Sequence, residues 1–114
     1  WHENDGSESF TTHVISSTAD QVHSVFAIDL DGDGDIDVLS ASRFDDTIAW
    51  YENPQPTVVM SADWFKPHYI STSEDGARAV YAIDMDGDGD IDVVSASWND
   101  DTVAWHENDG SESF

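Results

Sequence analysis

Two long stretches of this chain are nearly identical, and this internal repeat constrains the fold more than any other feature. Residues 27–53 align without gaps to residues 82–108 at an offset of 55, and upstream His13-Val-Ile-Ser lines up with His68-Tyr-Ile-Ser. A fixed period of this length is typical of repeat architectures, in which each repeat is one supersecondary unit that buries its apolar face against its neighbours.

The chain ends repeat as well. Residues 1–10, WHENDGSESF, are identical to residues 105–114. Trp1 and Trp50 are 49 positions apart and Trp50 and Trp105 are 55 apart, which together give a full period of 104 residues. We infer a super-repeat of two units, whose last ten residues begin a next copy. The alternative is an artificial duplication of the chain ends.

Within each repeat the residue pattern favours short strands. Runs rich in β-branched and aromatic residues are separated by clusters of Asp, Gly and Asn, and no segment keeps a helical period over a dozen positions. The expected strands are 10–15, 24–29, 37–42, 47–51, 65–70, 79–84, 92–97 and 102–106. Four short antiparallel strands in about 50 residues are typical of a propeller blade. The expected fold is therefore all-β, with two four-stranded antiparallel blades that form part of a larger propeller or tandem blade array.

This pattern divides the chain into three segments. Residues 1–26 are expected to be a partial blade end plus an outer strand that completes a neighbouring blade. Residues 27–81 form the first repeat, and residues 82–114 form the second repeat with the start of the next copy. The recurrent Trp1, Trp50 and Trp105 are expected to pack between blades, whereas Trp64 and Trp98 break the repeat and are candidate exposed contact residues.

Each repeat contains an acidic loop with the spacing DxDxDGDxD. Carboxylates at loop positions 1, 3, 5 and 9 can converge on one point, and position 7 can add a backbone carbonyl. Oxygen ligands at this density favour Ca²⁺, and the nearby absence of Cys and His argues against zinc. The sequence therefore predicts two calcium sites. Their candidate ligands are Asp29, Asp31, Asp33, Asp35 and Asp37 in loop 29–37, and Asp84, Asp86, Asp88, Asp90 and Asp92 in loop 84–92.

An EF-hand is the obvious competing interpretation, because its loop uses similar positions. It needs a bidentate Glu at loop position 12 and a helix on each side. Position 12 is Ser40 or Ser95 here, and both flanks are expected to be strands. The EF-hand is therefore rejected.

The pattern FAIDxDGDGDxDVLSAS…DDTIAWYEN resembles the FG-GAP, or VCBS-type, repeat of integrin-α-like β-propellers. This resemblance covers nearly the whole chain. It implies that each repeat is one four-stranded blade whose calcium loop joins the first two strands. It also implies side-chain ligands from Asp29, Asp31, Asp33 and Asp37 with a carbonyl ligand from Asp35, and the same roles for Asp84, Asp86, Asp88, Asp92 and, for the carbonyl, Asp90.

Complete propellers have about 4–8 blades, whereas only two fit this chain. The second blade is expected to lack its fourth strand, and residues 10–17 are expected to be a fourth strand with no blade in front of it. Because exposed strand edges recruit other strands, we expect head-to-tail assembly, which closes into a ring or continues as a filament.

The charge restricts the partners. The chain has 25 Asp and Glu against 3 Lys and Arg, a formal net charge of −22, which argues against nucleic acid and anionic membranes. There is no cysteine, no apolar run that could insert into a membrane and no visible signal peptide. The paired acids 45–46 and 100–101 are interpreted as turn residues rather than as a glycosidase pair, and no catalytic motif is present, so an enzyme is not expected.

The expected function is a calcium-binding structural or adhesive repeat outside the cell, secreted or at the cell surface, where calcium is millimolar. Its expected partner is itself, as a head-to-tail homo-oligomer. The alternatives are a carbohydrate-binding, lectin-like propeller module and an accessory domain of a secreted enzyme. A carbohydrate or a cell-surface protein is a further candidate partner.

Overall fold

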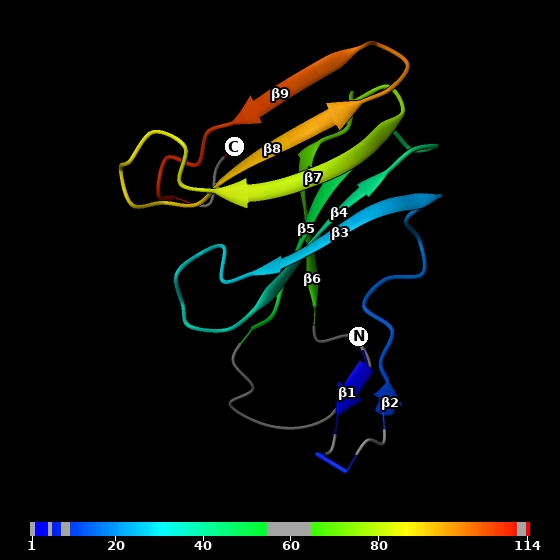
Figure 1. Cartoon of the computed structure of the whole chain (residues 1–114), viewed down its shortest axis with the longest axis vertical. Coiled ribbons are helices and arrows are strands. Elements are labelled where there is room, and N and C mark those ends of the chain that lie inside the picture. Colours follow the sequence, from blue (N-terminus) through cyan, green and yellow to red (C-terminus); the bar gives the residue numbers. More distant parts are fainter. Residues whose placement is uncertain (1, 5, 8–9, 55–64, 112–113) are drawn as a thin grey trace.

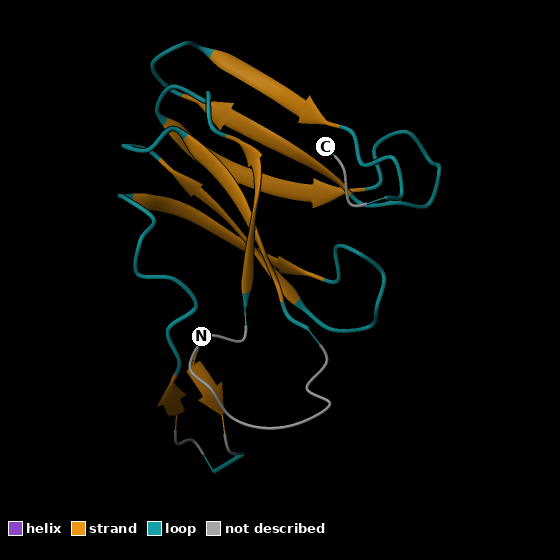
Figure 2. Ribbon diagram, turned by 180° about the vertical axis from the view of Figure 1, so that it is seen from behind, coloured by secondary structure: helices purple, strands orange, loops and turns teal. Residues whose placement is uncertain are grey.

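The computed structural model describes residues 2–4, 6–7, 10–54, 65–111 and 114, and these residues form strands and turns without a helix (Figure 1, Figure 2). The expected all-β fold is therefore confirmed. Among the described residues no helix is long and apolar enough to cross a membrane. Two of the tryptophans, Trp1 and Trp64, lie outside the described part of the chain, the latter within residues 55–64.

The first repeat forms an antiparallel four-stranded sheet in the order β3-β4-β5-β6. Its strands are β3 (Val22–Ile28), β4 (Asp37–Ser42), β5 (Thr47–Glu52) and β6 (Lys66–Ser71). The Asp45-Asp46 turn joins β4 to β5, and Asp46 adopts a left-handed φ of 53°, which Asp tolerates better than most residues.

The second repeat forms an antiparallel three-stranded sheet in the order β7-β8-β9. Its strands are β7 (Ala77–Ile83), β8 (Asp92–Ser97) and β9 (Thr102–His106), and they pair in the register of β3, β4 and β5. β7 packs against β3 and β4, so the two sheets lie one over the other.

The N-terminal segment behaves differently from expectation. Residues 10–17 were expected to be a strand with no blade in front, but β2 (Phe10–Thr12) is shorter and pairs antiparallel with β1 (His2–Asn4). His2 is opposite Thr12 and Asn4 is opposite Phe10. The equivalent residues of β5 and β6 have the same register, with Tyr51 opposite Pro67. The hairpin therefore reproduces the outer half of a sheet, and it lies at the end of the molecule opposite β9 (Figure 1).

The core lies between the two sheets. Leu39, Ala41, Ile48 and Trp50 from the first sheet meet Ala77, Val80, Ala82 and Val93 from the second, together with Leu30. The expected packing of the recurrent tryptophan between sheets is confirmed for Trp50, which is 1% exposed and stacks on His68. Its repeat equivalent Trp105 is 46% exposed, and Trp98 is exposed and lies under the guanidinium of Arg78.

Candidate metal centres in the two acidic loops

The two acidic loops occupy equivalent positions, between β3 and β4 and between β7 and β8. Both project from the same side of the molecule (Figure 1). A small cleft of about 110 Å³ separates them, and it is lined by Asp29 and Asp31 from the first loop and by Asp90 from the second. The negative charge of the two loops is therefore concentrated in one region.

The first carboxylate of each loop holds the turn together. Asp29 Oδ1 accepts a hydrogen bond from Gly32 N at 2.8 Å, and Asp29 Oδ2 accepts one from Gly34 N at 3.0 Å. Asp84 makes the same two bonds, to Gly87 N at 2.6 Å and to Gly89 N at 3.2 Å. All four glycines have positive φ, from 78° to 104°, which glycine adopts without steric cost. The DGDG sequence therefore lets the backbone wind around its first carboxylate.

The middle carboxylates continue this winding. Asp31 Oδ1 accepts from Asp33 N at 3.1 Å, and Asp33 Oδ1 accepts from Asp35 N at 2.8 Å. The second loop repeats both bonds, at 3.1 Å between Asp86 and Asp88 and at 2.9 Å between Asp88 and Asp90. Alternate aspartates thus satisfy backbone N–H groups within a tight loop, which is the usual behaviour of Asp in Asx turns.

The last carboxylate of each loop is buried and ties the loop to the sheet. Asp37 is 1% exposed and accepts hydrogen bonds from Leu30 N at 3.0 Å and Asn53 N at 2.8 Å. Asp92 is also 1% exposed and accepts from Met85 N at 2.9 Å and Asn108 N at 2.8 Å. These bonds close each loop at its base.

Sequence reasoning missed Asn53 and Asn108 as members of the site. The side chain of Asn53 donates to Ile36 O at 3.1 Å, and that of Asn108 donates to Ile91 O at 3.3 Å. Each Asn therefore holds its loop through both backbone and side chain. The recurrence of Glu-Asn after the third strand of both repeats was the signal that could have identified them.

Three carboxylates converge in each loop. Oxygens of Asp29, Asp31 and Asp37 lie within 4.8 Å of one another, as do oxygens of Asp84, Asp86 and Asp88. Asp33, Asp35, Asp90 and Asp92 lie outside these groups. Asp35 Oδ2 is nonetheless buried and has no hydrogen-bond partner among the described residues. Both oxygen-only clusters, and in the first loop the additional carboxylate of Asp35, fit a hard cation such as Ca²⁺.

The two buried carboxylates differ in their proton affinity. Burial raises the pKa of Asp37, and the N–H groups of Asn53 and Leu30 offset this only in part. Burial also acts to raise the pKa of Asp92, but the N–H groups of Asn108 and Met85 outweigh it, so that this pKa lies below its ordinary value. Asp37 additionally experiences the negative charge of Asp33. The carboxylate of Asp37 therefore binds a proton more readily than that of Asp92.

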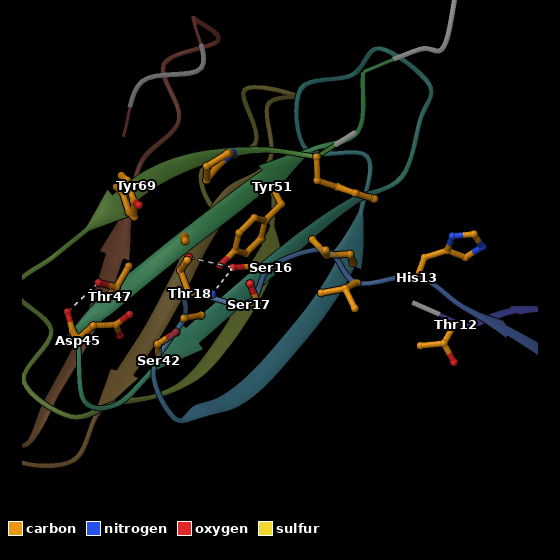
Figure 3. A pocket seen from close by; sticks show the side chains of 16 residues that line it. Thr12, His13, Ser16, Ser17, Thr18, Ser42, Asp45, Thr47, Tyr51 and Tyr69 are labelled. Atoms are coloured by element: carbon orange, nitrogen blue, oxygen red, sulfur yellow. Dashed lines mark hydrogen bonds between the residues drawn. The ribbon is translucent and has the colours of Figure 1, made fainter. Parts of the chain in front are cut away.

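A second concave feature lies on the first sheet. A cavity of about 700 Å³ separates residues 12–19 from β5 and β6, and Figure 3 shows hydroxyl and aromatic side chains around it. Tyr51 and Thr47 reach it from β5, and Tyr69 reaches it from β6. Ser42, which is 1% exposed, also lines it, and its Oγ has no hydrogen-bond partner among the described residues.

Comparison with known proteins gives one family. A family model described as an FG-GAP-like repeat matches residues 1–40 and 29–95. No curated protein and no solved structure matches the chain.

Proposed function

The chain belongs to the family of FG-GAP-like repeats, and from that premise we propose that it is a calcium-binding structural repeat module that assembles head-to-tail outside the cell. The observation that carries this proposal is the duplicated carboxylate cluster. Two loops of the same spacing, one per repeat, each bring three carboxylate oxygens within 4.8 Å of one another.

Calcium would act on stability through these residues. Asp29, Asp31 and Asp37 would hold one ion, and Asp84, Asp86 and Asp88 the other, with Asp33, Asp35, Asp90 and Asp92 as the remaining candidate ligands of the two loops. A bound divalent cation supplies positive charge where the loops place several carboxylates together. Because Asp37 and Asp92 also bond to backbone N–H groups at the base of each loop, a filled loop would brace the sheet to which it is tied.

The structural role is supported by the free edge of the second sheet. Among the described residues β9 pairs only with β8, whereas its equivalent β5 pairs with both β4 and β6. An unpaired edge of this kind is a template for a further strand. Further copies of the chain are therefore the proposed partner, in a closed ring or an open filament. Loops of multiple carboxylates in extracellular modules fill at millimolar calcium, which supports a location outside the cell.

Calcium titration of the purified chain tests this proposal. Calorimetry should give two sites per chain, and millimolar calcium should raise the midpoint of thermal unfolding in a manner that excess chelator reverses. Saturation at about 100 times the dissociation constant would add about 2.7 kcal/mol per site. An unfolding midpoint that does not respond to calcium or to chelator contradicts the proposal.

Matched variants make this test specific to the loops. Asp31→Asn and Asp86→Asn each keep a side-chain oxygen that can accept the backbone hydrogen bond but lose one negative charge. Each should remove or weaken one of the two calcium sites. Asp20→Asn makes the same charge change outside both loops and should leave two sites. Equal effects of all three variants would mean that calcium acts as a diffuse counterion.

A further inference from the structure

The two outward faces of the molecule are repeat equivalents of the two faces that meet in its core. The inner face of the first sheet consists of Leu39, Ala41, Ile48 and Trp50, and the inner face of the second consists of Ala77, Val80, Ala82 and Val93. The residues 55 positions after the first set are Val94, Ala96, Val103 and Trp105, which we call the outer face of the second sheet. The residues 55 positions before the inner face of the second sheet are Val22, Val25, Ala27 and Val38, which we call the outer face of the first sheet.

Equivalent residues therefore differ sharply in exposure. Ile48 is 0% exposed, whereas Val103 at the same repeat position is 76% exposed. Val80 is 6% exposed, whereas its equivalent Val25 is 67% exposed. Each outer face therefore has exposed apolar side chains whose repeat equivalents the fold buries. On the outer face of the first sheet these exposed side chains lie on β3, whereas Ala49 and Tyr51 of β5 are buried, at 2% and 7% exposed.

We propose that the outer face of the second sheet docks on the outer face of the first sheet of a second copy of this chain. The contact would repeat the interface between the two sheets, because the repeat equivalents of the two outer faces already pack against each other inside the chain. The contact is heterologous, since different surfaces of the two copies meet. This inference rests on the proposed head-to-tail assembly and specifies its interface.

The cavity on the first sheet is the place that the second copy would fill. Cross-strand pairing puts its lining residues Ser42, Thr47 and Tyr51 on the same face as Val38, which is the outer face of the first sheet. The repeat equivalent of this face is the inner face of the second sheet. There Trp50 and Ile48 of the first sheet pack against it in the core. Trp105 of a second copy is the repeat equivalent of Trp50 and would enter this cavity.

Strand pairing within the chain supplies a template for the edge contact. β1 has the same sequence as residues 106–108, which start with the last residue of β9, and it pairs with β2 in the register that joins β5 to β6. Residues 106–108 of another copy can therefore replace β1 beside residues 10–12 with the same backbone register. Exchange of one identical segment for the other joins the two copies without a new type of pairing.

Two complementary substitutions test the proposed contact by sedimentation velocity in millimolar calcium. Val103→Lys places a charge on the outer face of the second sheet, and Val25→Lys places one on the outer face of the first. Both side chains are exposed, at 76% and 67%, so each variant should keep the unfolding midpoint of the parent. Phe44→Lys, an exposed turn residue outside both faces, is the control for added positive charge.

The expected result is that the parent and Phe44→Lys form concentration-dependent oligomers while each face variant alone stays monomeric. An equimolar mixture of Val103→Lys and Val25→Lys should give a one-to-one dimer, because each variant retains the face that the other has lost. A mixture that stays monomeric, or a face variant that assembles as well as Phe44→Lys does, would overturn the proposal. So would a monomeric parent whose cavity binds a simple methyl glycoside.

Calcium titration of the two monomeric variants separates this inference from the proposed function. If both variants still bind two calcium ions while the mixture fails to pair, only the interface is wrong. If calcium neither binds nor stabilises any of the chains, the proposed function itself fails.

Discussion

Ser97 Oγ donates a 2.7 Å hydrogen bond to Glu74 Oε2 on the face of the second sheet that packs against the first. Ser95 Oγ donates to the same carboxylate oxygen at 3.2 Å, and His106 Nε2 lies 3.0 Å from Ser95 Oγ. Glu74 is 8% exposed, so this polar cluster is buried. At the equivalent position of the first repeat stands Ala19, and there Ser42 Oγ has no hydrogen-bond partner among the described residues.

The variant Glu74→Ala should destabilise the chain. It converts the second repeat to the residue that the first repeat carries, and it leaves the hydroxyls of Ser95 and Ser97 without their carboxylate acceptor. Loss of hydrogen bonds to a charged group predicts a decrease of about 1.5–3 kcal/mol in the free energy of unfolding. Urea denaturation at fixed calcium measures it. An unchanged midpoint would mean that the cost of burying the carboxylate cancels these bonds.

The reciprocal variant Ala19→Glu should stabilise the chain. The new carboxylate would offer Ser42 Oγ the acceptor that Ser97 finds in Glu74. One added hydrogen bond to a charged group, less the cost of burying that charge, predicts a gain of about 0.5–1 kcal/mol. The uncharged Ala19→Gln is the control for side-chain volume, and chemical denaturation compares the two. A loss of stability with Glu and not with Gln would contradict the prediction.

Acidification should weaken the fold through His106. Burial lowers the pKa of His106 below its ordinary 6.5, and the nearby carboxylate of Glu74 opposes this only in part. The folded state therefore binds the proton less readily than the unfolded state does. This contribution to stability is complete above pH 6.5 and is lost as the pH falls from there through the lower folded pKa. The decline should be visible in denaturation curves between neutral and mildly acidic pH.

The variant His106→Gln tests whether that decline belongs to this residue. Gln does not titrate, so the variant should show a flatter pH dependence of stability in the same window. His23→Gln is the matched control, because His23 is exposed on β3 and lies outside the polar cluster. Identical pH profiles for the two variants would assign the decline to other groups.

Much of the fold follows from the sequence because its period is visible in the residues. The strands 37–42, 92–97 and 102–106 were predicted with the bounds that the structure shows, since the first two follow loops rich in Asp and Gly and the third follows an Asn-Asp-Asp turn. The exposure of Trp105 was not predictable in this way. Trp50 and Trp105 have nearly the same local sequence, and their exposure differs because only Trp50 lies on a face that meets the other sheet.

The pairing of β1 with β2 also could not be predicted from the sequence. Residues 1–10 and 105–114 are identical, so local sequence cannot decide which copy pairs with residues 10–12. The two acidic segments connect strands, as the sequence predicted, but their spacing did not show that Asp37 and Asp92 accept hydrogen bonds from backbone N–H groups. One bond to each carboxylate is donated by Asn53 or Asn108, which lie 16 residues further along the chain.

A substitution after β9 should affect the second loop alone. Gly110 has a φ of 78°, and a Cβ there would lie 2.6 Å from Asp90 Oδ2, which is too close for an undisturbed contact. Gly110→Ala should therefore displace Asp90 and weaken calcium binding at the second loop. Gly6→Ala is a close control, because Gly6 occupies the same place in the identical decapeptide and has a φ of 83°, but an added Cβ meets no described atom within 4 Å. Calorimetry that finds both variants equally impaired would assign the effect to backbone strain.

The two equivalent tryptophans should have unequal effects on the isolated chain. Trp50 is 1% exposed in the core and stacks on His68 with ring centroids 4.5 Å apart, so Trp50→Ala should lower the free energy of unfolding by about 3–5 kcal/mol. Trp105 is 46% exposed, and Trp105→Ala should cost the dilute chain about 1 kcal/mol. The order should change in an assembly assay at high concentration, where Trp105→Ala should remain a folded monomer. Equal destabilisation of the dilute chain by both variants would show that Trp105 is buried within a single copy, and would remove the basis for placing it in the cavity of another.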